Sequence, residues 1–331
     1  MKFEQSDHIS TDLIHLFENT VLGTNGAKYK HLDVAQSVAH TDNPLSFSLR
    51  RREQLIANIT FCKRPFGLYL RYFAFEQRFQ SKGKARANPK SKIKQEIATV
   101  FDDIIAKYPG SDDYCYAYID AKNIRSKWMS ETFSFRTKAY LATQSFSRIW
   151  PKADPLLKEE RMSSELFETI EKNYRHYTAY FTHFFEDGRV YSLFDSNGKR
   201  LAFAQFHKVR WEIQSLPGKL GGLSVKLLPF IPFLNQLIQP KEHTFLVPDI
   251  VCNPSGNIKD VERLFEAVLA KESLHSLLWW NDTRDLLYRE AKQKLSWGLL
   301  HQIIGVAEVD VVVRGDFEPK NPFFIAAFDM V

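Results

Sequence analysis

The 331-residue sequence contains few cysteines and no pattern that would use them in a scaffold. Its three cysteines, Cys62, Cys115 and Cys252, are widely spaced and form no C-x-x-C pair, which excludes a disulfide framework and a cysteine zinc site. The histidines are scattered without the spacing of metal ligands, so we expect no metal site. We therefore expect buried free thiols in a reducing compartment.

Long apolar runs are also missing from the sequence. No stretch is long and clean enough to span a bilayer. The first ten residues, MKFEQSDHIS, lack the basic and apolar regions of a signal peptide. The sequence thus predicts a cytoplasmic protein without a membrane span.

The composition is that of a folded globular protein. Hydrophobic residues make up 44% of the chain and charged residues 25%, and the aromatic share is high because of 27 Phe. Such a composition argues against disorder over most of the chain. A length of 331 residues favours two domains of similar size or one large one.

Positive charge is concentrated in one stretch. The formal net charge is +6, and residues 82–94, KGKARANPKSKIK, are rich in lysine and contain no acidic residue. Three interpretations are open: a solvated loop, a site for an anion such as a phosphate, and a nucleic-acid-binding patch. A compact phosphate site fits this short stretch better than duplex DNA does.

The first half of the sequence alternates between strand-like and helical patterns. Three apolar runs separated by short turns predict an antiparallel meander, and a helix capped by Asn88 follows. The predicted strands are 45–51, 55–64, 67–75, 114–119 and 138–146, with a short helix at 123–133.

The second half repeats this order after a proline-containing linker at residues 147–155. An Asn-Gly turn joins two predicted strands, and strands then alternate with helices. The predicted strands are 189–195, 201–216, 244–252, 276–280 and 306–314, with helices at 258–272 and 283–295. We predict two copies of one mixed α/β unit, over residues 1–150 and 156–331, each a mixed, mostly antiparallel sheet flanked by helices.

The phosphate interpretation gains support from what surrounds the lysine-rich stretch. Residues 80–85 follow a predicted strand, contain Gly83, and precede a helix start within a few residues. Unpaired backbone N–H groups converge on an anion in this geometry, and glycine permits close approach.

At this point the sequence resembles the GNAT N-acetyltransferase superfamily. Gln80-Ser81-Lys82-Gly83-Lys84-Ala85 matches the Q/R-x-x-G-x-G/A pyrophosphate loop of that superfamily. After the next strand the superfamily carries N-x-x-A/S-x-x-L-Y-x-x-x-G-F, and residues 123–135 follow it at matching spacing. Asn123, Ser126, Met129 and Phe135 occupy the corresponding positions. The motifs cover residues 40–146, and the second half matches by element order alone.

The resemblance implies that the chain binds acetyl-CoA or another acyl-CoA and transfers the acyl group to a small-molecule or peptide amine. It places the pyrophosphate on residues 80–85, the pantetheine along Phe73 to Phe75, and Asn123 and Ser126 near the acyl-carrier arm. Glu76 is the candidate base for the amine. Ser130 occupies the position where the superfamily has its general-acid Tyr, and its hydroxyl is a far weaker acid.

The second half carries Tyr288 at the superfamily spacing from Asn281, either as a catalytic group or as a core aromatic residue of an amphipathic helix. Its preceding loop lacks the glycine pattern, so we expect one cofactor-binding half and one degenerate half. A non-catalytic acyl-CoA-binding or scaffold protein is the alternative function, and a nucleic-acid-binding module is a third.

Two segments of the second half fall outside these motifs. Residues 174–185 favour an aromatic-rich buried helix. Residues 216–240 are apolar, proline-punctuated and basic at two points, and they fit an interdomain core, a partner-binding patch or a cap on the acceptor cleft.

Overall fold

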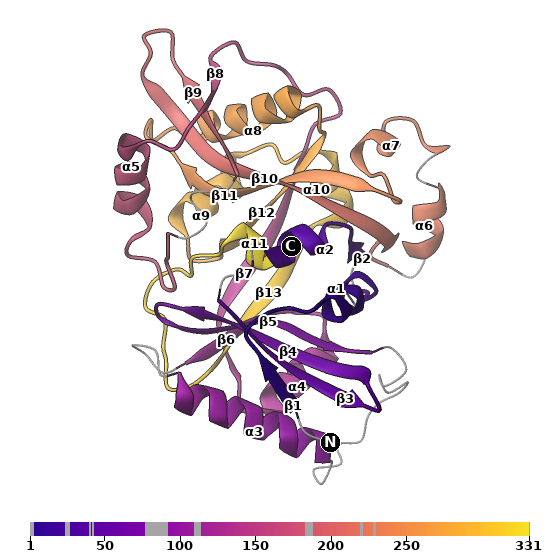
Figure 1. The fold of residues 1–331 in the computed structure, drawn as a ribbon. Helices are drawn as coiled ribbons and strands as arrows, with labels where there is room; N and C mark the ends of the chain where they lie inside the picture. Colours follow the sequence, from indigo (N-terminus) through magenta and orange to yellow (C-terminus); the bar gives the residue numbers. More distant parts are fainter. Residues whose placement is uncertain are drawn as a thin grey trace.

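The computed structural model contains one sheet that runs through the whole molecule. It describes residues 3–23, 27–39, 41, 43–76, 92–108, 114–182, 188–218, 221–227 and 230–330. Within these ranges thirteen strands pair in a continuous mixed sheet, which occupies the lower and the upper part of Figure 1.

The N-terminal half begins with an antiparallel meander and ends in a parallel pair. The meander follows the predicted runs because their apolar residues alternate between two buried faces. Its strands are β1 (Phe3–Ser6), β3 (Pro44–Arg51), β4 (Gln54–Arg64) and β5 (Gly67–Phe75), and β6 (Cys115–Asp120) pairs parallel to β5.

The C-terminal half has the same order of elements. An antiparallel meander again leads to a parallel pair of strands, with a helix between the members of that pair. The elements are β8 (Leu157–Glu160), β9 (Arg189–Phe194), β10 (Arg200–Ser215), β11 (His243–Cys252), α8 (Ile258–Glu272) and β12 (Ser276–Asp282). β2 (Lys28–His31), from the N-terminal half, also pairs with β10.

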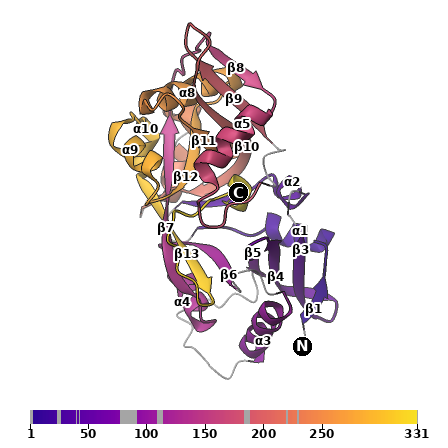
Figure 2. The ribbon, with the colours of Figure 1, turned by 90° about the vertical axis from the view of Figure 1, so that its left-hand side faces the viewer.

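The last strand of each half pairs with strands of the other half. β7 (Arg136–Ser147) pairs with β12, and β13 (Val306–Arg314) pairs with β6. β7 and β13 also pair with one another, so the two cross the centre of the molecule side by side (Figures 1 and 2). The two halves are therefore joined by backbone hydrogen bonds, and a division between residues 150 and 156 stays a prediction.

One long helix packs on the sheet of each half. Ile97, Phe101 and Ile104 of α3 (Lys92–Lys107) lie at helical spacing and are at most 1% exposed. In α8, Asn257 caps the helix by accepting a hydrogen bond from the Lys259 N–H. These helices close the two main hydrophobic cores.

Shorter helices complete the molecule. They are α1 (Thr11–Glu18), α2 (Val34–Ala39), α4 (Ile124–Thr132), α5 (Ser164–Tyr174), α6 (Gly221–Leu227), α7 (Leu234–Leu237), α9 (Leu286–Lys294), α10 (Leu299–Ile304) and α11 (Ala327–Met330). No helix among the described residues is long and apolar enough to cross a membrane. The three cysteines are buried free thiols, as the sequence predicts.

Candidate functional site

The parallel strands of the N-terminal half form a fork. β5 and β6 pair at Leu68–Cys115 and Tyr69–Tyr116 only, and their C-terminal parts make no further pairs with one another. The pairing register between β4 and β5 shifts next to the last of these pairs. Phe61 pairs with Leu70 and Thr60 pairs with Tyr72, so Arg71 has no partner residue in β4. Arg71 is thus the extra residue of a β-bulge where the strands separate.

The α3 face of this open fork is apolar. Phe73, Phe75, Ile119 and Met129 pack on the N-terminal core and remain only partly buried. Among the described residues, β5 and β6 do not pair with one another past Tyr69–Tyr116, and an extended ligand can pair with a strand in such a place. The fork therefore suits an elongated ligand with an apolar part and amide groups.

The helix that begins at the fork positions the residues of the second sequence motif. The side chain of Asn123 accepts a hydrogen bond from the Ser126 N–H at 3.0 Å, which caps α4. One turn later, the hydroxyl of Ser130 donates to the Lys127 carbonyl at 2.7 Å. The hydroxyl proton of Ser130, which a general acid at this position would donate to a leaving group, is therefore engaged in a hydrogen bond.

Glu76 follows β5 directly, beside the fork. Its backbone N–H donates to the Ile56 carbonyl at 2.9 Å, and its side chain is partly buried. The phosphate loop of the sequence motif, residues 80–85, lies outside the described residues, as do Asn88 and the predicted helix start. The structure thus brings Phe73, Phe75 and Glu76 onto one strand and its end.

A buried ion-pair cluster lies on the opposite face of the fork. Asp329, on α11, contacts Arg64 at 2.9 Å and Arg71 at 3.0 Å, and all three side chains are at most 2% exposed. The hydroxyl of Tyr69 donates to the Asp329 carbonyl at 2.7 Å. Although burial opposes the charge of Arg71, the neighbouring Tyr72 and Asp329 raise its pKa. α11 therefore holds the bulged residue of β5 in a buried ion pair.

Tyrosines of β5 and β6 cover the rest of this face. The rings of Tyr69 and Tyr116 stack with their centres 5.2 Å apart, and Tyr118 lies against both. Burial raises the pKa of all three hydroxyls well above the ordinary value of 10.0, so they are neutral and are poor acids at pH 7.

The corresponding fork of the C-terminal half is filled by the chain itself. β11 and β12 pair at Leu246–Leu277, and a register irregularity follows in β11. The hydroxyl of Tyr174 donates to the Val251 carbonyl at 2.8 Å and accepts from the Val251 N–H at 3.1 Å. Phe324 packs on the Tyr174 ring with the ring centres 5.8 Å apart. An extended ligand would have to displace these groups to pair with Val251.

Tyr288 lies in the core of the C-terminal half. It is 1% exposed, it packs edge-on against Trp279, and its hydroxyl donates to the side chain of Gln144 at 3.4 Å. Burial, aided by the charge of Glu308, raises its pKa to about 12. Its surroundings are those of a core aromatic residue, one of the two interpretations that the sequence left open.

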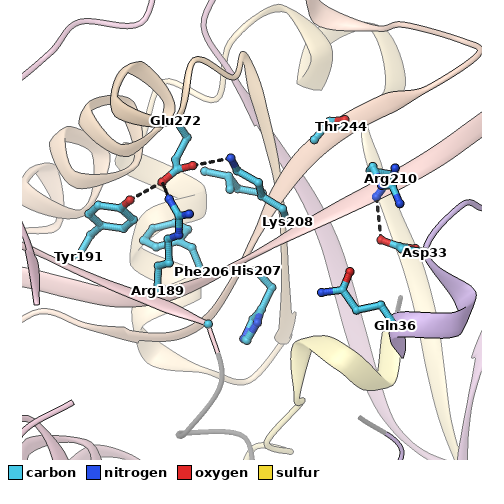
Figure 3. Close-up of a pocket in the computed structure, with 12 residues that line it drawn as sticks. Asp33, Gln36, Arg189, Tyr191, Phe206, His207, Lys208, Arg210, Thr244 and Glu272 are labelled. Atoms are coloured by element: carbon cyan, nitrogen blue, oxygen red, sulfur yellow. Dashed lines mark hydrogen bonds and ion pairs between the residues drawn. The ribbon is translucent and has the colours of Figure 1, made fainter. Parts of the chain in front are cut away.

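A polar pocket of about 520 Å³ lies between β9, β10, α2 and the end of α8 (Figure 3). Lys208 and Arg189 contact the Glu272 carboxylate at 2.6 and 2.9 Å, and Tyr191 also donates to it. Burial opposes the ionisation of Glu272, but the hydrogen bonds from Lys208 and Tyr191 lower its pKa. The charged side chains around Glu272 in this pocket are therefore paired with one another.

The described residues contain no group of three or more His, Cys, Asp or Glu that could hold a metal ion.

No sequence motif marks Arg71, Asp329 or Tyr174. The alternation of Tyr69 with Arg71 on a predicted strand was a usable signal, since it places both on one face. Asp329 is separated from Arg71 by 258 residues, and no local pattern marks it.

Comparison with known proteins supplies a fold. No family model matches the chain, and no curated protein matches it by sequence. N-myristoyltransferase of Saccharomyces cerevisiae with bound myristoyl-CoA matches 96% of this chain and 80% of its own, with a TM-score of 0.59 and 8% identity. Another structure of that enzyme, with inhibitors, covers 99% and 85% at a TM-score of 0.57 and 10% identity.

A tandem GNAT protein from the clavulanic acid biosynthesis pathway matches over nearly the full length of both chains. It covers 95% of this chain and 98% of its own, with a TM-score of 0.52 and 7% identity. At these identities the likeness shows the fold alone. The chain has a mixed α/β, GNAT-like fold, which confirms the fold that the sequence motifs predicted.

Proposed function

We propose that the N-terminal half binds acyl-coenzyme A in the open fork and transfers its acyl group to an amine. One observation supports this proposal: among the described residues, β5 and β6 separate after Tyr69–Tyr116 beside an apolar, partly buried face, whereas Tyr174 and Phe324 fill the corresponding fork of the C-terminal half. The chain would thus have one binding half and one degenerate half, as the loop motifs of the sequence suggest.

The ligand class follows from the fork and from the comparisons. The yeast N-myristoyltransferase structures contain bound myristoyl-CoA. In this chain the pantetheine would pair with the edge of β5 around Phe73 to Phe75 and reach the start of α4 at Asn123 and Ser126. The pyrophosphate would bind the backbone of residues 80–85.

The chemistry requires a neutral amine and a leaving thiolate. In our proposal Glu76 takes the proton of the ammonium, directly or through a water, and the amine nitrogen attacks the thioester carbonyl. A new C–N bond then forms while the C–S bond breaks, and the nitrogen releases its second proton to solvent. Since the Ser130 hydroxyl already donates to Lys127, the thiolate takes its proton from solvent. Tyr288, buried against Gln144, contributes packing rather than an acid.

A non-catalytic acyl-CoA-binding or scaffold protein is the second candidate. The engaged hydroxyl of Ser130 favours it, because the position that holds an acid in the superfamily supplies none here. Neither candidate specifies the acceptor or partner, which is a small-molecule amine or a peptide. Neither specifies the length of the acyl group, which is acetyl or longer. We also propose that the protein is cytoplasmic and does not bind nucleic acid.

Calorimetric titration with coenzyme A tests the shared part of both candidates. We expect binding by the wild type and its loss in Gly83→Glu, which fills and charges the phosphate loop. Unchanged affinity in that variant would show that the phosphates bind elsewhere. Consumption of acetyl-CoA across a panel of amines then separates an enzyme from a binder. Glu76→Gln should slow turnover and leave coenzyme A affinity unchanged.

A further inference from the structure

The insertion between β10 and β11 forms a projection at the edge of the molecule. It contains α6 and α7, which lie beyond the end of β10 on the right of Figure 1. Its inner side is anchored, because Val225, Leu237 and Ile238 are buried in one cluster with Ile213 and Leu300. The outer side faces solvent, so the segment is not buried as a whole, as an interdomain core would be.

The outer side carries a group of exposed apolar side chains that we call the apolar tip. Phe230 is 81% exposed and Trp150 is 68% exposed. Leu227 and Phe233 are each 49% exposed, and Ile231 is 41% exposed. The rings of Trp150 and Phe233 meet at a centre distance of 5.3 Å, so the tip includes the connection that follows β7. Apolar residues gathered in this way mark an interaction site rather than ordinary surface.

Backbone strain supports a role for the tip outside the fold. Phe233 has a φ of 69°, in the left-handed region that bulky residues rarely adopt. Its ring is nevertheless half exposed, so the strain is not offset by burial in the core. Strain of this kind commonly accompanies function.

Charge around the tip is mainly positive. Residues 216–241 contain three Lys and no acidic residue. Lys226 and Lys241 line a hollow of about 680 Å³ beside the tip, and Glu212 is the one carboxylate among the described residues of that lining. A protein interface core is normally depleted of lysine, whereas lysines flanking exposed aromatic residues suit anionic lipid headgroups.

We propose that the apolar tip binds the surface of a membrane that contains anionic lipids. Phe230, Ile231 and Phe233 enter the boundary between headgroups and acyl chains, Trp150 lies at the headgroup level, and the lysines contact lipid phosphates. This inference rests on the exposed surface alone and does not depend on acyl-CoA binding or transfer.

Sedimentation with lipid vesicles tests the proposal. We expect the wild-type chain to bind phosphatidylcholine vesicles containing phosphatidylglycerol far better than vesicles of phosphatidylcholine alone. Phe230→Ser should weaken binding about tenfold, because it withdraws one aromatic side chain from the bilayer. Lys226→Glu should weaken binding about fivefold or more, and only on the anionic vesicles.

Leu286→Ser is the matched control. Leu286 is 77% exposed on α9, outside the tip, so its replacement should leave vesicle binding unchanged. Circular dichroism checks that each variant is folded. The proposal is overturned if the folded wild type stays in solution with anionic vesicles, or if Leu286→Ser weakens binding as much as Phe230→Ser. A concentration-dependent dimer that Phe230→Ser dissociates, without vesicle binding, would assign the tip to a second copy of the chain instead.

Discussion

Replacing Tyr174 with Phe removes one oxygen from the filled fork of the C-terminal half. That oxygen donates to the Val251 carbonyl at 2.8 Å and accepts from the Val251 N–H at 3.1 Å, and Val251 is 2% exposed. The variant keeps the ring and its contact with Phe324. It leaves two buried backbone groups of β11 without their partner.

The cost follows from the burial of these groups. Each buried group deprived of its partner costs about 1–3 kcal/mol, so Tyr174→Phe should lower the free energy of unfolding by about 2–6 kcal/mol. Urea denaturation measures this change. Tyr180→Phe is the matched control, because its hydroxyl donates to the side chain of Glu171 at 2.7 Å and is only part-buried. We expect the control to cost less than about 1.5 kcal/mol.

Equal and small losses in the two variants would refute the reasoning. They would mean that the Tyr174 hydroxyl does not hold the edge of β11, and that the C-terminal fork is available to a ligand. In that case the claim of a single binding half would lose its structural basis.

Two further predictions concern ion pairs and pH. Asp329→Asn removes the carboxylate that Arg64 and Arg71 share, so we expect a loss of about 3–5 kcal/mol in urea denaturation. Burial lowers the pKa of His31 and His243 from 6.5 to about 4. As the pH falls, the unfolded chain therefore binds these protons first, and stability should drop between pH 6.5 and 4 by up to about 3 kcal/mol for each histidine. Replacing His243 with Phe should flatten this drop in an acid-denaturation series, and an unchanged slope would contradict the assignment.

The sequence predicted most of the sheet. β4, β5, β11 and β13 lie within a residue or so of the predicted runs, because each is a clear apolar stretch bounded by turns or glycine. The short strands at the edges carry few apolar residues, and β1 and β8 were missed for that reason. The exchange of β7 and β13 between the halves could not be predicted, since it depends on pairing between segments far apart in the chain.

The helix expected over residues 174–185 is wrong over its described part, residues 175–182, and residues 183–185 lie outside the described residues. α5 ends at Tyr174, and Thr178 forms a bridge with Phe323. Aromatic residues in that segment meet the C-terminal segment, a contact that local periodicity does not reveal. The same limit applies to the site: Phe73, Phe75 and Asn123 follow from motifs, whereas Asp329 and Tyr174 reach their forks through tertiary contacts alone.

The number of coenzyme A molecules bound per chain tests the central claim most directly. Calorimetric titration of the wild type should give one, and Ile119→Arg, which places a charge in the open fork, should abolish that binding without unfolding the chain. Leu286→Arg, on the exposed side of α9, should bind as the wild type does. Two molecules per chain, or no binding by the folded wild type, would contradict the account.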